Sequence, residues 1–89
     1  MGKFELEIVY CVPCGHHGVA TWLVGEFFKE YGSEAAIKFT PADNGRLEVY
    51  INGEKIFDRK EEGNIFPDLS HVKSLKNIIN AKKQTLPVN

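Results

Sequence analysis

The residues best suited to chemistry in this 89-residue sequence are two cysteines, which stand in one tetrapeptide, Cys11-Val12-Pro13-Cys14. A disulfide stabilises a fold most when it closes a long loop, and this pair closes almost none. A secreted domain held by disulfides would also carry more cysteines, spread along its chain. The spacing therefore favours redox chemistry over two buried structural thiols, and we expect the reducing cytoplasm as the compartment.

The flanking patterns place this motif between a strand and a helix. Apolar and charged residues alternate over 3–10, which predicts a strand. Apolar residues recur at helical spacing over 17–31, and Gly32 is suited to end that helix. Unpaired amides at a helix start stabilise a thiolate, the nucleophile of disulfide exchange. One sulfur could attack a substrate, and the other could resolve the mixed disulfide.

The next segments predict a strand and a hairpin. Residues 36–40 form a short strand with Ile37 and Phe39 inward, and 41–45 is a loop. Strands over 46–51 and 54–58 flank Asn52-Gly53, the sequence most typical of a type I′ turn. This two-residue turn is expected to pair Val49 with Ile56 and Tyr50 with Lys55.

A second helix is predicted after Pro67, with Asp68 or Ser70 as its cap. The order strand, helix, strand, strand, strand, helix indicates a parallel crossover followed by an antiparallel hairpin. We expect a two-layer α/β (α+β) domain with a four-stranded mixed sheet, spanning 1–89, with 83–89 as a frayed tail. The apolar face of the second helix comprises Leu69, Val72, Leu75, Ile78 and Ile79.

Charge and hydropathy exclude several classes of partner. Eleven basic and 12 acidic residues give a net charge of −1, which provides no general attraction for nucleic acid. The longest apolar run is far shorter than the roughly 18 residues of a membrane span. The alternating, charged first residues do not resemble a signal peptide. We expect no nucleic-acid partner and no membrane association.

The histidines beside the motif raise a metal-carrier alternative, in which Cys11, Cys14 and His16 bind zinc or copper. Structural zinc sites usually pair two ligand groups separated by a dozen or more residues, whereas these ligands are crowded together. We therefore assign no metal ligand and no cofactor. His16 either tunes the thiols or faces solvent with His17. Trp22 is expected to pack in the core, and Phe66 to line a substrate groove or simply to pack.

An ordered set of motifs resembles the selenoprotein W family over residues 4–82. The resemblance implies a thioredoxin-like fold and a redox role linked to thiols and glutathione. It rests on Tyr10-Cys11-Val12-Pro13-Cys14-Gly15, Thr21-Trp22-Leu23, Gly45-Arg46-Leu47-Glu48-Val49, Asn52-Gly53, Asp58-Arg59-Lys60, Gly63 and Phe66-Pro67.

The resemblance leaves open which cysteine reacts first. Selenium-containing members place selenocysteine at the position of Cys14, whereas helix geometry favours Cys11 as the attacking thiol. Bacterial relatives tend to have an aromatic residue and a basic residue where this chain has His16 and Gly18, so only His16 could supply a cation there. Thioredoxins carry a cis-proline before the hairpin, and Pro41 is the nearest candidate, although we do not expect a cis bond.

The leading hypothesis is a small thiol–disulfide redox protein. Cys11 and Cys14 would cycle between dithiol and disulfide, with glutathione or a protein thiol as partner. Pro13, His16 and Phe66 would lie beside the substrate or tune the thiols. The second hypothesis is a redox-switched binding module without turnover, docked by a partner protein at the Cys-x-x-Cys loop. The metal carrier is the third.

Overall fold

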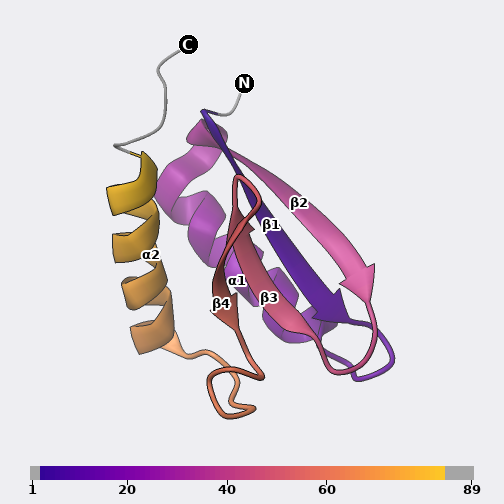
Figure 1. Cartoon of the computed structure of the whole chain (residues 1–89). Coiled ribbons are helices and arrows are strands. Elements are labelled where there is room, and N and C mark those ends of the chain that lie inside the picture. The colour runs from indigo at the N-terminus through magenta and orange to yellow at the C-terminus, as the bar shows by residue number, and fades with distance from the viewer. Residues whose placement is uncertain (1–2, 84–89) are drawn as a thin grey trace.

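The computed structural model describes residues 3–83, which form a four-stranded sheet and two long helices (Figure 1). The bounds of the first helix agree with the predicted 17–31. Lys83 is the last residue of the second helix, and the rest of the predicted tail, 84–89, lies outside the described residues. The elements are β1 (Phe4–Cys11), α1 (His17–Tyr31), η1 (Gly32–Glu34), β2 (Ala35–Ala42), β3 (Leu47–Ile51), β4 (Glu54–Asp58) and α2 (Leu69–Lys83).

The strands form a mixed sheet in the order β2-β1-β3-β4. β1 pairs with β2 in parallel, and the helix α1 connects the two. β1 pairs with β3 and β3 with β4 in antiparallel fashion. The predicted combination of a parallel crossover and an antiparallel hairpin is therefore confirmed, and β1, which ends at Cys11, is a central strand.

Both helices pack on one face of the sheet, so the domain has two layers. Alternate residues of β1 and β3 point into the core because successive side chains of a strand face opposite sides. Each helix contributes a stripe of buried residues to the same cluster. The core consists of Phe4, Leu6, Ile8, Ala20, Leu23, Phe27, Tyr31, Ala35, Leu47, Val49, Ile51, Phe57, Val72, Leu75 and Ile79.

The hairpin differs from the prediction by one bulge. Tyr50 pairs with Lys55 as expected, but Val49 pairs with Phe57 and not with Ile56. The register shifts between Val49 and Tyr50, which inserts Ile56 as an extra residue in β4. The larger Phe57 side chain is thereby buried against the core, while Ile56 is only half-buried.

The strand β2 is longer than predicted and includes Pro41, which pairs with Tyr10. A proline is tolerated here because β2 is an edge strand. Phe39 pairs with the core residue Ile8, so it lies on the inward face of the sheet as expected. It is nevertheless 41% exposed at this edge, with its ring resting edge-on against Tyr10 at 5.2 Å. Residues 3–83 contain no cis peptide bond, Pro41 included.

Asp68, one of the two residues predicted as the cap of α2, is the residue that caps this helix. Its carboxylate accepts hydrogen bonds from the amides of Ser70 and His71 at 3.0 and 3.1 Å. The predicted apolar face is only partly correct, since Leu69 is 62% exposed and Ile78 is 38% exposed. Leu69 is the first residue of α2 and lines a shallow surface hollow with Trp22 and Pro67. The buried residues of α2 are Val72, Leu75 and Ile79.

Candidate functional site

Cys11 and Cys14 form a disulfide with their Cα atoms 5.4 Å apart. Cys11 is the last residue of β1 and is completely buried, whereas Cys14 is exposed in the turn that precedes α1. The two sulfurs therefore lie in different environments, and a partner in solution reaches the disulfide from the side of Cys14.

The connection from β2 to β3 crosses over the end of β1, because β1 lies between these two strands in the sheet (Figure 1). The crossing is a tight turn in which Asn44 and Gly45 have φ angles of 60° and 73°. Positive φ at both central positions is the requirement of a type I′ turn. The amide of Arg46 closes the turn by donating to the carbonyl of Asp43 at 3.3 Å.

This turn holds residues 11–16, here called the redox loop, through backbone hydrogen bonds. The amide of Cys11 donates to the carbonyl oxygen of Arg46 at 2.7 Å, and that of Val12 donates to the carbonyl of Ala42 at 3.0 Å. Within the loop, the amide of His16 donates to the carbonyl of Cys11 at 3.1 Å. The end of β1 is therefore hydrogen-bonded to the segments on both of its flanks, Ala42 on the β2 side and Arg46 on the β3 side.

His16 is the buried polar residue of the loop, with 6% of its surface exposed. Its Nδ1 atom lies 3.3 Å from the carbonyl oxygen of Arg46, and because a carbonyl only accepts, Nδ1 carries the proton in this contact. The imidazole also packs edge-on against the ring of Phe66 at 5.1 Å between centroids. The alternative in which His16 faces solvent is wrong, whereas His17 is exposed as expected.

The other predicted site residues lie in the Cys11–Cys14 loop or against His16. Pro13 is exposed between the cysteines, and Phe66 is half-exposed against His16. Val12 is also exposed, which adds an apolar side chain to this end of the molecule. Trp22 is partly buried against the core, as predicted. The roles of Pro13, His16 and Phe66 toward a substrate stay predictions.

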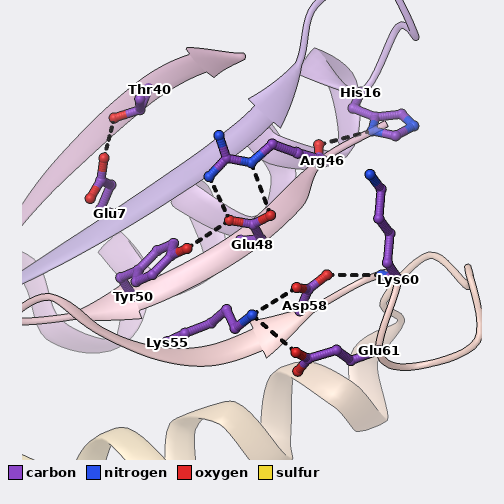
Figure 2. Close-up of polar contacts among 10 residues, drawn as sticks. All are labelled: Glu7, His16, Thr40, Arg46, Glu48, Tyr50, Lys55, Asp58, Lys60 and Glu61. Atoms are coloured by element: carbon purple, nitrogen blue, oxygen red, sulfur yellow. Dashed lines mark hydrogen bonds and ion pairs between the residues drawn. The ribbon is translucent and has the colours of Figure 1, made fainter. Parts of the chain in front are cut away.

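A polar network on the face of the sheet that the helices leave uncovered extends to this site (Figure 2). The guanidinium of Arg46 donates to both carboxylate oxygens of Glu48, at 3.0 and 2.9 Å, and the hydroxyl of Tyr50 donates to the same group at 2.7 Å. The hydrogen bond from Arg46 lowers the pKa of Glu48, and the bond to Glu48 raises the pKa of Tyr50.

The network was not predicted from the sequence. Its only signal is the spacing of Arg46, Glu48 and Tyr50, which places the three side chains on one face of a strand. Glu48 is buried although the helices do not cover its face, because Arg46 and Tyr50 lie against it. The network fixes the side chain of Arg46, and the backbone carbonyl of Arg46 holds Cys11 and His16.

Neither a metal-binding cluster nor a membrane-spanning helix occurs among residues 3–83. No three histidine, cysteine or carboxylate side chains of this part of the chain gather as a metal-binding group. Cys11 and Cys14 are bonded to each other, and Nδ1 of His16 is turned to a carbonyl. The two long helices of the described chain both lack the length and apolar character to cross a bilayer.

The fold and the site define a thioredoxin-like domain with a redox-type Cys-x-x-Cys disulfide at the end of its first strand. Comparison of the sequence with protein-family profiles then gives a match to the Rdx family over residues 5–81. The chain belongs to the Rdx family, which is related to selenoprotein W, and the resemblance derived from its motifs is confirmed.

Solved structures agree with this assignment. A selenoprotein W-related protein from Vibrio cholerae is 31% identical, with a TM-score of 0.80 over 92% of this chain and 99% of that one. A Bordetella parapertussis protein is 25% identical, with a TM-score of 0.72 over 80% of this chain and 90% of that one. No curated protein sequence matches the chain.

A more distant structure confirms the fold class alone. A mutant thioredoxin from Halobacterium salinarum is 15% identical, with a TM-score of 0.50 over 97% of this chain and 80% of that one. The family, the thioredoxin-like fold and the disulfide between Cys11 and Cys14 together support a thiol redox role.

Proposed function

We propose that this protein exchanges its Cys11–Cys14 disulfide with glutathione or with a protein thiol. The observation that carries the proposal is the asymmetry of the disulfide, in which Cys14 is exposed and Cys11 is buried. Disulfide exchange requires in-line access of a thiolate to one sulfur, and burial protects the other sulfur from side reactions. We expect this exchange to take place in the reducing cytoplasm.

The two cysteines then have distinct roles. An incoming thiolate attacks Sγ of Cys14, the bond between the two protein sulfurs breaks, and Cys11 leaves as the thiolate. A second substrate thiolate attacks the substrate sulfur of the mixed disulfide, which releases the substrate disulfide and the Cys14 thiolate. Two substrate thiols are thus oxidised and one protein disulfide is reduced. In the reverse direction Cys14 attacks and Cys11 resolves.

A redox titration tests this proposal. The protein is equilibrated with mixtures of reduced and oxidised glutathione, acid-quenched, alkylated, and analysed by intact mass. The expected result is a two-electron transition between dithiol and intramolecular disulfide at a defined ratio of the two forms. The proposal is wrong if the two thiols never form an intramolecular bond at any ratio.

A second candidate is a binding module that is switched by oxidation and has no turnover. The exposed apolar side chains of Val12 and Phe66 beside the disulfide favour it, because a docking partner would bury them. Capture of partners by wild type and by Cys14→Ser, under reducing and oxidising conditions, separates the two functions. Capture that is independent of redox state, with no activity in an exchange assay, supports the binding module.

A further inference from the structure

The charged residues near the redox loop differ in their pairing. The side chain of Arg46 is bound to Glu48, and Lys55 is bound to Asp58 at 2.9 Å and Glu61 at 3.0 Å. The next two cations, Arg59 and Lys60, directly follow β4. Within residues 3–83, the side chains of Arg59 and Lys60 form no ion pair with a carboxylate.

Both of these cations lie at the end of the molecule that carries the disulfide. The guanidinium carbon of Arg59 lies 4.5 Å from the ring centroid of Phe66, and the same ring contacts His16 of the redox loop. A Cβ atom added to Gly45, in the turn above Cys11, would lie 3.7 Å from Cε of Lys60. Figure 2 shows the Lys60 side chain extending away from Asp58, toward His16 and Arg46.

The guanidinium of Arg59 has an unmet hydrogen-bond requirement. Its Nε atom is sealed from solvent and has no acceptor within the described part of the chain. The terminal nitrogens of an arginine present a planar fork that matches a carboxylate in two parallel hydrogen bonds. Because Nε is sealed, an anion from solution would bind these terminal nitrogens, and the charge of Lys60, the next residue, would attract it as well.

We infer that Arg59 and Lys60 form a carboxylate-binding rim beside Cys14, which favours thiol substrates that carry a carboxylate close to their sulfur. The inference rests on the proposed exchange reaction and names the class of thiol that enters it. The carboxylate is held by the rim while the thiolate of the same molecule attacks Sγ of Cys14, with the bonds formed and broken as in the exchange described above. A neutral or cationic thiol reacts at the same sulfur without this contact.

The test compares small thiols of different charge. Rates of disulfide reduction are measured at low ionic strength with 3-mercaptopropionate, 2-mercaptoethanol and cysteamine, each normalised to its thiolate concentration because the thiolate is the nucleophile. Wild type is expected to react fastest with 3-mercaptopropionate and slowest with cysteamine. Added salt is expected to reduce this preference, since exposed charges are screened.

Variants assign the preference to the rim. The double substitution Arg59→Gln and Lys60→Gln is expected to lower the rate ratio of 3-mercaptopropionate to 2-mercaptoethanol by about fivefold, the effect of an exposed ion pair. Arg59→Lys keeps the charge but loses the planar guanidinium, and it is expected to lower the same rate ratio by a smaller factor. Lys3→Gln removes one positive charge about 26 Å away, at the other end of β1, and is expected to leave the ratio unchanged.

The outcomes separate the two proposals. If none of the three thiols reduces the wild-type disulfide, the exchange function itself is wrong. If 2-mercaptoethanol reduces it and the three normalised rates are equal, or the double variant keeps the wild-type ratio, the rim is overturned while the function stands. Glutathione and an acidic cysteine peptide, each against its esterified or amidated form, then show whether small or peptide thiols use the rim.

Discussion

The amide of Cys11 donates a hydrogen bond to the carbonyl oxygen of Arg46 at 2.7 Å, so the buried half of the disulfide is fixed to the turn that crosses β1. The same carbonyl oxygen accepts a hydrogen bond from Nδ1 of His16, and the Arg46 side chain forms an ion pair with Glu48. A residue outside the Cys-x-x-Cys motif therefore holds both ends of the redox loop. The uncovered face of the sheet is thereby coupled to the site.

We expect Glu48→Gln to lower the free energy of unfolding by about 2 kcal/mol, because it leaves Arg46 and Tyr50 with a neutral partner in a partly buried network. Hydrogen exchange at the Cys11 amide should become faster, since Arg46 is less firmly held. Urea denaturation and amide exchange by NMR measure the two effects.

Lys55→Gln is the matched control, because it breaks the two ion pairs of Lys55, with Asp58 and Glu61, which lie on the same face and include no residue of the crossing turn. Lys55→Gln is expected to lower the free energy of unfolding less than Glu48→Gln does, because the Lys55 side chain is more exposed than that of Glu48. It is expected to leave hydrogen exchange at the Cys11 amide unchanged. Equal acceleration at Cys11 in both variants would show that Glu48 has no specific effect on the loop.

The difference in burial predicts different reactivities for the two cysteines. In the reduced protein, iodoacetamide should modify Cys14 at least about tenfold faster than Cys11, because reaction requires an accessible thiolate. Peptide mass spectrometry after timed quenching measures both rates.

Single substitutions check the same assignment. Cys11→Ser should accumulate a mixed disulfide between Cys14 and glutathione, since no second thiol is present to resolve it. Cys14→Ser should remain largely unmodified, because its remaining thiol is buried. Equal glutathionylation of the two variants would place the first reaction at both sulfurs and contradict the assignment of Cys14 as the attacked sulfur.

The glycine of the crossing turn has a testable conformational role. Gly45 has φ of 73°, so Gly45→Ala is expected to destabilise the fold by about 1 kcal/mol through backbone strain. Crowding is not the cause, because the nearest atom to the added Cβ, Cε of Lys60, lies at an ordinary contact distance of 3.7 Å.

The same substitution in a helix provides the control. Gly25 lies inside α1 with open space around it, so Gly25→Ala should stabilise the protein by about 1 kcal/mol through helix propensity. Chemical denaturation of both variants gives the comparison. A stabilised Gly45→Ala variant would mean that the crossing turn does not require a positive φ at this position.

The fold was predictable from the sequence where local signals agree. The helix over 17–31 has a wide apolar stripe and ends at Gly32, whose φ is positive, and Asn52-Gly53 sets the hairpin. The bulge at Ile56 was not predictable, because Ile56 and Phe57 are adjacent apolar residues and only core packing decides which of the two turns inward. The exposure of Phe39 depends on strand order, which periodicity does not contain.

The sequence predicts the sulfur chemistry of the site but not the contacts that hold the redox loop in place. Cys11, Cys14 and His16 are recognisable by residue type and spacing. The support from Arg46 is made by a backbone carbonyl, and a carbonyl carries no residue-type signal. Arg59 also stands in a charged segment that is typical of a solvated loop, and the stacking of its guanidinium on Phe66 and its unpartnered Nε are visible only once its neighbours are placed.

The cap of α2 predicts a pH dependence of stability. Hydrogen bonds from the amide and ring of His71, and from Ser70, lower the pKa of Asp68 from 3.8 to about 2. Because the folded pKa lies below the unfolded value, the charged cap stabilises the fold fully above pH 3.8. This contribution is lost as the pH falls through about 2.

Asp68→Asn separates the charge of the cap from its hydrogen bonds, because an amide oxygen still accepts from the Ser70 and His71 amides. The variant should melt a few degrees below wild type at neutral pH, and the difference should vanish as the pH falls from 3.8 to about 2. Asp68→Ala removes the acceptor and should stay less stable than Asp68→Asn throughout. Thermal melts across this range measure all three proteins. A difference between wild type and Asp68→Asn that is the same at neutral pH and at about pH 2 would show that the Asp68 charge does not stabilise the helix.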